Sequence, residues 1–175
     1  MTIPDAPPLN LDLTMGIDPG LNCTGYALLQ KASGGPKLCE GGVIRSSRQQ
    51  SLAARVHEIT VGFRELLEQY RPRSLAIEQV FVTPQFPKSA LLMAHVRGAI
   101  LMTAVDYQVT VTHYPATQIK RMLTGSGRAS KSQMQHAVQR ELQLPKLPEP
   151  HDLADALAIA LCHYYSVRFV ATAAS

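Results

Sequence analysis

The sequence lacks the features that usually mark secreted, zinc-binding and membrane-spanning proteins. Its three cysteines are odd in number and far apart, with no CxxC pair, so we expect reduced thiols rather than disulfides or a zinc site. No charged segment followed by an apolar one opens the chain, so we expect no signal peptide. The closest approach to a membrane span, residues 89–105, contains His95 and Arg97. We therefore expect a cytoplasmic protein without a membrane partner.

The length and charge of the chain indicate one domain with an acidic partner. A chain of 175 residues is long enough to bury a core of its own, and no internal repeat divides it. We expect a flexible leader over residues 1–12, a single domain over 13–168 and a tail over 169–175. A formal net charge of +4 and a pI near 9.1 suit an acidic polymer such as nucleic acid.

Hydrophobic periodicity predicts an α/β fold with a five-stranded mixed sheet and helices on both faces. The strands are expected in a hairpin over residues 13–29 and at 37–44, 74–81 and 108–113, with a bulge at Gly41-Gly42. The helices are expected at residues 51–70, 90–105, 115–123, 131–142 and 152–167. The helix at 90–105 is apolar nearly all round, which indicates either core packing or a dimer interface.

Four carboxylates stand beside apolar residues instead of in polar segments: Asp18, Glu78, Asp152 and Asp155. Buried carboxylates are costly unless cations or hydrogen-bond donors compensate them. Two Mg²⁺ ions would balance the four charges and could clamp the attacking and leaving oxygens of a phosphodiester. The simpler alternatives are that Asp18 forms a turn with Pro19-Gly20, and that Asp152 caps a helix with Asp155 in its first turn.

A cationic block follows in the second half of the chain. No acid occurs between Tyr107 and Arg140, whereas five cations do, namely Lys120, Arg121, Arg128, Lys131 and Arg140. Such a block around a Gly/Ser-rich loop is typical of a surface that binds a phosphate backbone. The alternative is a solvated face, although solvated helices usually mix charges of both signs.

The motifs GIDPG with TGYALL, AIEQVF, ATQIKRMLTGSG with KSQMQ, and DLADALAIAL resemble the RuvC Holliday-junction resolvases in order and spacing, between Met15 and His163. The resemblance implies an RNase H-like fold and a homodimer that cuts four-way DNA junctions by paired symmetric nicks, leaving 5′-phosphates, in recombination and repair. It further implies Mg²⁺ or Mn²⁺ as cofactor, two ions per subunit, and a branch-migration helicase as partner.

The resemblance also assigns site residues. It places metal-binding catalytic acids at Asp18, Glu78, Asp152 and Asp155, a base-stacking aromatic at Phe81, and functional lysines at Lys120 and Lys131. We expect Arg121 and Arg128 to join the lysines on the DNA. His151 is a metal ligand, an outer partner of one, or an ordinary loop residue. The segment after Phe81 is proline-rich and longer than is usual in the family.

Three other functions remain open on the sequence. An actin-like ATPase would need a second phosphate-binding hairpin, which a chain with a single Asp-Pro-Gly does not supply. A nuclease of the same fold could act on another nucleic acid. A non-catalytic junction-binding module would not need all four acids.

Overall fold

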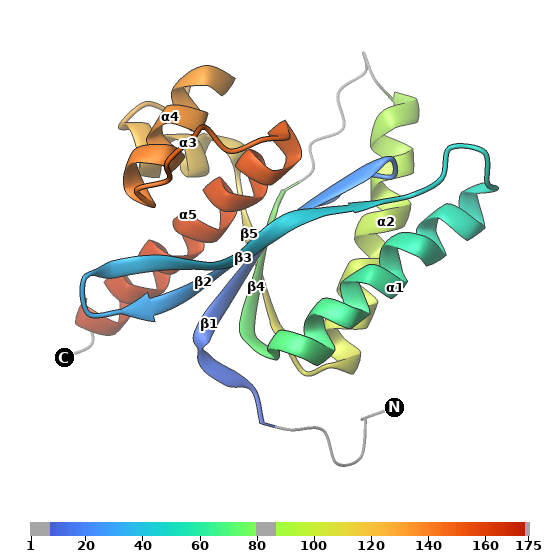
Figure 1. The fold of residues 1–175 in the computed structure, drawn as a ribbon, viewed down its shortest axis with the longest axis horizontal. Helices are drawn as coiled ribbons and strands as arrows, with labels where there is room; N and C mark the ends of the chain where they lie inside the picture. Colours follow the sequence, from blue (N-terminus) through green and yellow to red (C-terminus); the bar gives the residue numbers. More distant parts are fainter. Residues whose placement is uncertain (1–7, 80–86, 174–175) are drawn as a thin grey trace.

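A five-stranded mixed sheet forms the centre of the computed structural model, which describes residues 8–79 and 87–173 (Figure 1). The strand order is β3-β2-β1-β4-β5. The first three strands form an antiparallel meander, and β4 and β5 run parallel to β1. The strands are β1 (Asn10–Asp18), β2 (Cys23–Ala32), β3 (Gly35–Arg45), β4 (Pro72–Glu78) and β5 (Thr110–Tyr114).

Helices cover both faces of this sheet, as the sequence predicts. On one face α1 (Leu52–Tyr70) and α2 (Pro87–Asp106) pack against a core that includes Ile17, Phe63 and Ile77. On the other face lie α3 (Ala116–Thr124), α4 (Lys131–Glu141) and α5 (His151–Ala173), over a second core that includes Ala76 and Leu157. The predicted fold class is confirmed.

Helix α5 contacts β1 without intervening side chains. A Cβ at Gly16 would overlap the backbone of Ala156 and Ala160, so only glycine allows the helix to lie this close. The helix residues that face the sheet there are small, which brings the two backbones together. This contact fixes the height of α5 over the centre of the sheet.

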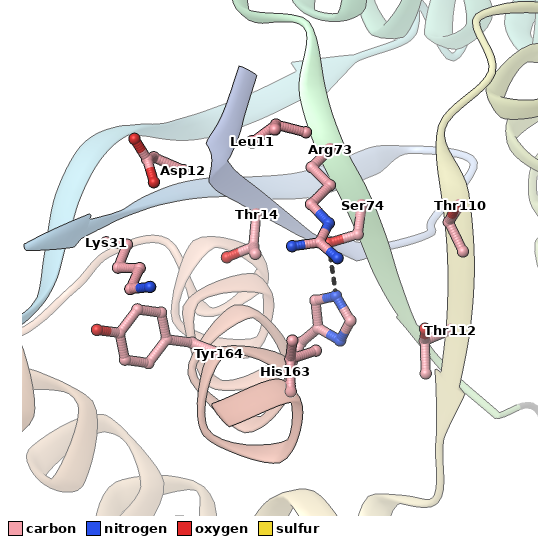
Figure 2. A pocket seen from close by; sticks show the side chains of 11 residues that line it. Leu11, Asp12, Thr14, Lys31, Arg73, Ser74, Thr110, Thr112, His163 and Tyr164 are labelled. Carbon is pink, nitrogen blue, oxygen red and sulfur yellow. Dashed lines mark hydrogen bonds between the residues drawn. The ribbon is translucent and has the colours of Figure 1, made fainter. Parts of the chain in front are cut away.

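A buried polar network ties α5 to the sheet farther along the helix. The ring of His163 hydrogen-bonds the Ser74 hydroxyl of β4 at 2.7 Å, as Figure 2 shows, and the Tyr114 hydroxyl of β5 at 2.9 Å. Burial, with a smaller contribution from the charge of Arg73, lowers the pKa of His163 to about 4. The imidazole is therefore neutral and can donate at one nitrogen while accepting at the other.

Several details differ from the sequence expectation, among them two element ends and the position of a bulge. Strand β1 begins at Asn10, inside the predicted leader, because Asn10 pairs with Pro72 and its N–H donates to the Arg71 carbonyl at 2.6 Å. Helix α5 continues to Ala173, into the predicted tail. The bulge lies at Cys39 rather than at Gly41-Gly42, since Leu28 pairs with Glu40 and Leu29 with Leu38.

Helix α2 buries one side and exposes the other. Val96, Ile100 and Ala104 are buried in the core, whereas Met102 and Val105 are 62% and 72% exposed. By length and composition alone, residues 88–106 could also cross a membrane. Their packing against the sheet and α1 indicates instead a helix of the folded domain with an uncovered apolar stripe.

We predict that Gly16→Ala destabilises the protein by about 2 kcal/mol or more, because the added methyl group must push α5 away from β1. Gly34→Ala is the matched control, since no heavy atom lies within 4 Å of a Cβ there. It should leave stability unchanged or raise it by about 0.4–1 kcal/mol. Urea unfolding of both variants provides the measurement. Equal stability of the two variants would contradict the close packing.

Candidate active site

The register of two parallel strands places Asp18 and Glu78 together. Ile17 of β1 pairs with Ile77 of β4, and each carboxylate follows directly at the end of its strand. Side chains alternate along a strand, so Asp18 shares the face of Gly16, against which α5 packs. Glu78 likewise shares the face of Ala76, which belongs to the core under α5. Both acids therefore point to the α5 side of the sheet.

The first turns of α5 bring two more acids to the same place. Asp155 lies one position before Ala156, whose backbone contacts Gly16, and so stands over the end of β1. Gly25 of β2 contacts the carbonyl of Asp152 so closely that no Cβ would fit. The start of α5 is thus held against β1 and β2 by two glycines.

A cavity of about 350 Å³ collects three of the four predicted acids and both predicted lysines. Asp18, Glu78 and Asp155 line it together with Lys120 of α3 and Lys131 of α4. The Lys131 Nζ lies 4.0 Å from the Asp155 carboxylate. The structure therefore brings three of the four acids together from opposite ends of the chain.

Asp152 lies beside this cavity rather than inside it. It lines a neighbouring hollow together with Gly20 and Cys23, where burial and the charge of Asp152 raise the pKa of the Cys23 thiol. The proposed capping role for Asp152 is not observed, because α5 begins at His151 and the Pro150 carbonyl accepts the first helical bonds. Asp152 occupies the first turn, where the helix dipole favours a negative charge. His151 is exposed at the start of the helix.

Burial and mutual repulsion make the acids of the cavity unusually basic. Burial, and then the charges of Asp155, Glu78 and Asp152, raise the pKa of Asp18 to about 8, with a smaller opposing effect of Lys131. Burial also raises the pKa of Glu78 and of Asp155. Asp18 therefore keeps a proton at neutral pH that an isolated carboxyl group would have lost.

The donor set suits a hard divalent cation. Mg²⁺ and Mn²⁺ prefer carboxylate oxygens, and Mg²⁺ keeps several of its waters when bound. Within residues 8–79 and 87–173, no three acidic, imidazole or thiol side chains converge into a finished coordination site. Water molecules would thus have to complete the coordination of any ion at Asp18, Glu78 and Asp155.

The cations of the predicted DNA surface surround the cavity unequally. Lys131 is the first residue of α4, where reciprocal hydrogen bonds between Ser130 and Gln133 fix the start of the helix. Arg121 and Arg128 are exposed on α3 and the following loop, outside the cavity lining. Phe81 lies outside the described residues.

A larger cavity of about 490 Å³ lies at the other ends of the strands (Figure 2). Lys31 and Arg73 line it with His163, and Asp12 is its one acidic side chain. A lone exposed acid cannot form a carboxylate cluster. The smaller cavity is therefore the candidate active site.

Two neighbours of Glu78 were missed in the sequence. Arg97 of α2 donates to its backbone carbonyl, and His113 of β5 bonds Arg97, on the face of the sheet opposite the cavity. The available signal was a single arginine inside an apolar helix, which the sequence analysis treated only as an interruption. Cys23, taken as a packing residue, was missed as a neighbour of Asp152 in the adjoining hollow.

Comparisons with known proteins give one consistent match. Residues 14–163 match the family described as "Crossover junction endodeoxyribonuclease RuvC". The chain is 46% identical to the protein of that name from Rhodopirellula baltica, over 91% of this chain and 90% of the relative. It is 40% identical to the one from Shewanella loihica, over 90% of each. A solved structure of T. thermophilus RuvC in complex with a Holliday junction substrate superposes with a TM-score of 0.83 at 34% identity, covering 90% of this chain and 96% of that one.

We predict that the metal-free protein loses stability as the pH rises between the ordinary Asp18 pKa of 3.8 and the folded value of about 8. In this window the unfolded chain releases the proton while the folded protein keeps it, which costs up to about 1.4 kcal/mol per pH unit. Above pH 8 both states are ionised and the dependence ends. Urea unfolding in EDTA from pH 5 to 8 measures the slope.

In Asp18→Asn, the free energy of unfolding should depend less steeply on pH than it does in the wild type. Asp12→Asn, which alters an exposed acid away from the cavity, should keep the wild-type slope. Parallel slopes for wild type and Asp18→Asn would show that Asp18 is not the perturbed group.

Proposed function

Because the chain belongs to the RuvC family of crossover junction endodeoxyribonucleases, we propose that it resolves four-way DNA junctions by hydrolysing phosphodiester bonds in homologous recombination and DNA repair. Paired, symmetric nicks that leave 5′-phosphate ends would complete each resolution. The observation that supports this activity best is the meeting of Asp18, Glu78 and Asp155 in one cavity beside two lysines.

The acids would hold two Mg²⁺ ions per subunit, with Mn²⁺ as the alternative. Asp18, Glu78 and Asp155 would contribute oxygens from three structural elements, and Asp152 would contribute from the adjoining hollow. When bound, such ions supply the positive charge that activates a water and stabilises the leaving oxygen. His151, next to Asp152, is proposed as an outer partner of this site.

The lysines would neutralise DNA phosphates in addition to the acids of the cavity. Lys131 is 76% exposed at its side chain, so its ammonium group can reach a DNA phosphate beside Asp155. Lys120 lies across the same cavity. Such fixed charges stabilise the charge that develops at phosphorus during hydrolysis. Arg121 and Arg128 would extend this contact along the DNA backbone, and Phe81 would stack on an unpaired base.

A homodimer would supply the two active sites that paired nicks require. The exposed apolar stripe of α2 is the proposed interface, because Leu91, Met102 and Val105 are 61%, 62% and 72% exposed on one side of the helix. A branch-migration helicase is proposed as a further partner, in the cytoplasm, on the family resemblance.

We predict that Asp18→Asn binds a synthetic four-way junction as tightly as the wild type but loses Mg²⁺-dependent cleavage at least 100-fold. The amide keeps the shape of the side chain while removing the charge that a divalent ion needs. Binding is measured in Ca²⁺ or EDTA, and both nicks are mapped in Mg²⁺. Asp12→Asn is the control and should cut normally. Normal cutting by Asp18→Asn would refute the proposed site.

The same assay separates the remaining alternatives. Cleavage of a four-way junction is compared with cleavage of an RNA–DNA hybrid and of plain duplex. Preference for the hybrid would favour a nuclease of the same fold with another substrate. Binding without any metal-dependent cutting would favour a non-catalytic junction-binding module.

We predict that Met102→Glu converts the dimer to a monomer, because a charge in an apolar interface must be desolvated without a partner. Sedimentation at micromolar concentration measures the state. Leu11→Glu is the control: Leu11 is 69% exposed on β1, away from α2, and its replacement should leave the dimer intact. A monomeric wild-type protein, or a dimeric Met102→Glu variant, would exclude this interface.

A further inference from the structure

Arg97 reaches the candidate active site from behind the sheet. It lies in the middle of α2 and is half-buried. Its Nη1 donates to the backbone carbonyl of Glu78 at 2.5 Å, and its Nη2 donates to Nδ1 of His113 at 2.6 Å. The guanidinium therefore links the last residue of β4 to the neighbouring strand β5.

The alternation of side chains separates this link from the acids. His113 pairs with Ile77, which lies in the core under α1 and α2, whereas Tyr114 pairs with Glu78 and bonds His163 of α5. Arg97 and His113 thus occupy one face of the sheet, and the Glu78 carboxylate the other. Arg97 holds the main chain of Glu78 by this hydrogen bond, and its charge also lowers the pKa of the Glu78 carboxyl group.

The Glu78 main chain lies where the hydrogen bonds between strands end. Pairing of β4 with β1 stops at Ile77, and on the β5 side the final bond runs from the Gln79 N–H to the Tyr114 carbonyl at 2.8 Å. The Glu78 carbonyl accepts its side-chain hydrogen bond from Arg97. A guanidinium can only donate, so His113 must accept at Nδ1, which fixes both donors of Arg97 in direction.

We propose that Arg97 is a positioning residue that fixes the peptide of Glu78 so that its carboxylate meets Asp18 and Asp155 over a divalent ion. His113 orients the guanidinium and has the smaller share in this role. The inference rests on the proposed metal-dependent function. Groups that orient metal ligands from outside typically change metal affinity 10- to 100-fold when they are removed.

The test measures metal binding directly, without DNA. In Arg97→Ala, Mn²⁺ binding followed by electron paramagnetic resonance should weaken about tenfold. The Mg²⁺ concentration for half-maximal junction cleavage should rise by a similar factor, with most of the rate recovered at saturating Mg²⁺. Arg97→Lys keeps the charge but not the two-pronged geometry, and should restore only part of the affinity. His113→Ala should show a smaller loss in the same direction.

Arg64→Ala is the matched control, because it removes an exposed arginine from α1 on the same face of the sheet. Its Mn²⁺ affinity should equal that of the wild type. Thermal unfolding of all variants accompanies the binding measurements. If Arg97→Ala does not fold, Arg97→Lys and His113→Ala supply the decisive affinities.

A double-mutant cycle with Glu78→Gln shows whether Arg97 acts through Glu78. If it does, Arg97→Ala should cost no further Mn²⁺ affinity once Glu78 has lost its charge. Additive losses would overturn the proposal. So would unchanged Mn²⁺ affinity in Arg97→Ala with junction binding in EDTA weakened as much as cleavage, since Arg97 would then contact DNA.

These outcomes are distinct from failure of the proposed function. If Glu78→Gln alone leaves both Mn²⁺ binding and cleavage unchanged, the metal site itself is wrongly assigned. If Glu78→Gln weakens Mn²⁺ binding while Arg97→Ala does not, the metal site stands and the positioning role of Arg97 is refuted.

Discussion

The close contact between α5 and β1 is the constraint on which the candidate site depends. The acids on β1 and β4 are placed by strand register alone, but Asp155 reaches them only because Gly16 lets the helix backbone lie directly on the strand. Gly25 does the same for the first turn of α5, next to Asp152. Because Gly16 and Gly25 have no side chains, acids that are more than 130 residues apart in the sequence can lie close together in space.

This arrangement of buried acids lowers the stability of the fold and makes the electrostatic potential of the cavity more negative. Burial and mutual repulsion raise the pKa of Asp18 to about 8, so without a bound cation the cluster keeps a proton on Asp18 at neutral pH. Lys131 is too exposed and, at 4.0 Å from Asp155, too distant to neutralise the set. The same repulsion, which would destabilise the metal-free fold as the pH rises, would favour the proposed binding of a divalent ion.

The sequence predicted the parts of the site that follow from local pattern. Asp18 stands out because it ends an apolar strand, Glu78 because it interrupts one, and Asp155 because it opens an apolar helix, so their convergence could be inferred from an α/β fold. Asn10 and Cys39 could not be placed, because strand ends and bulges depend on the partner strand. Arg97 was missed because it donates to a backbone carbonyl, and every residue has one, so the sequence gives no sign of which carbonyl accepts the bond. Phe81 retains a role assigned by resemblance alone.

The two faces of the sheet have different features, and both faces contact Glu78. The face under α5 collects the acids and the lysines, whereas the face under α2 has the uncovered apolar stripe of Met102 and Val105. Side chains cannot cross a sheet, but a backbone carbonyl at the end of a strand can be reached from the opposite side. At Glu78 the main chain therefore contacts α2 while the carboxylate serves the cavity. The helix that we propose as the dimer interface is in this way joined, through the Arg97 hydrogen bond, to the main chain of the proposed metal ligand Glu78.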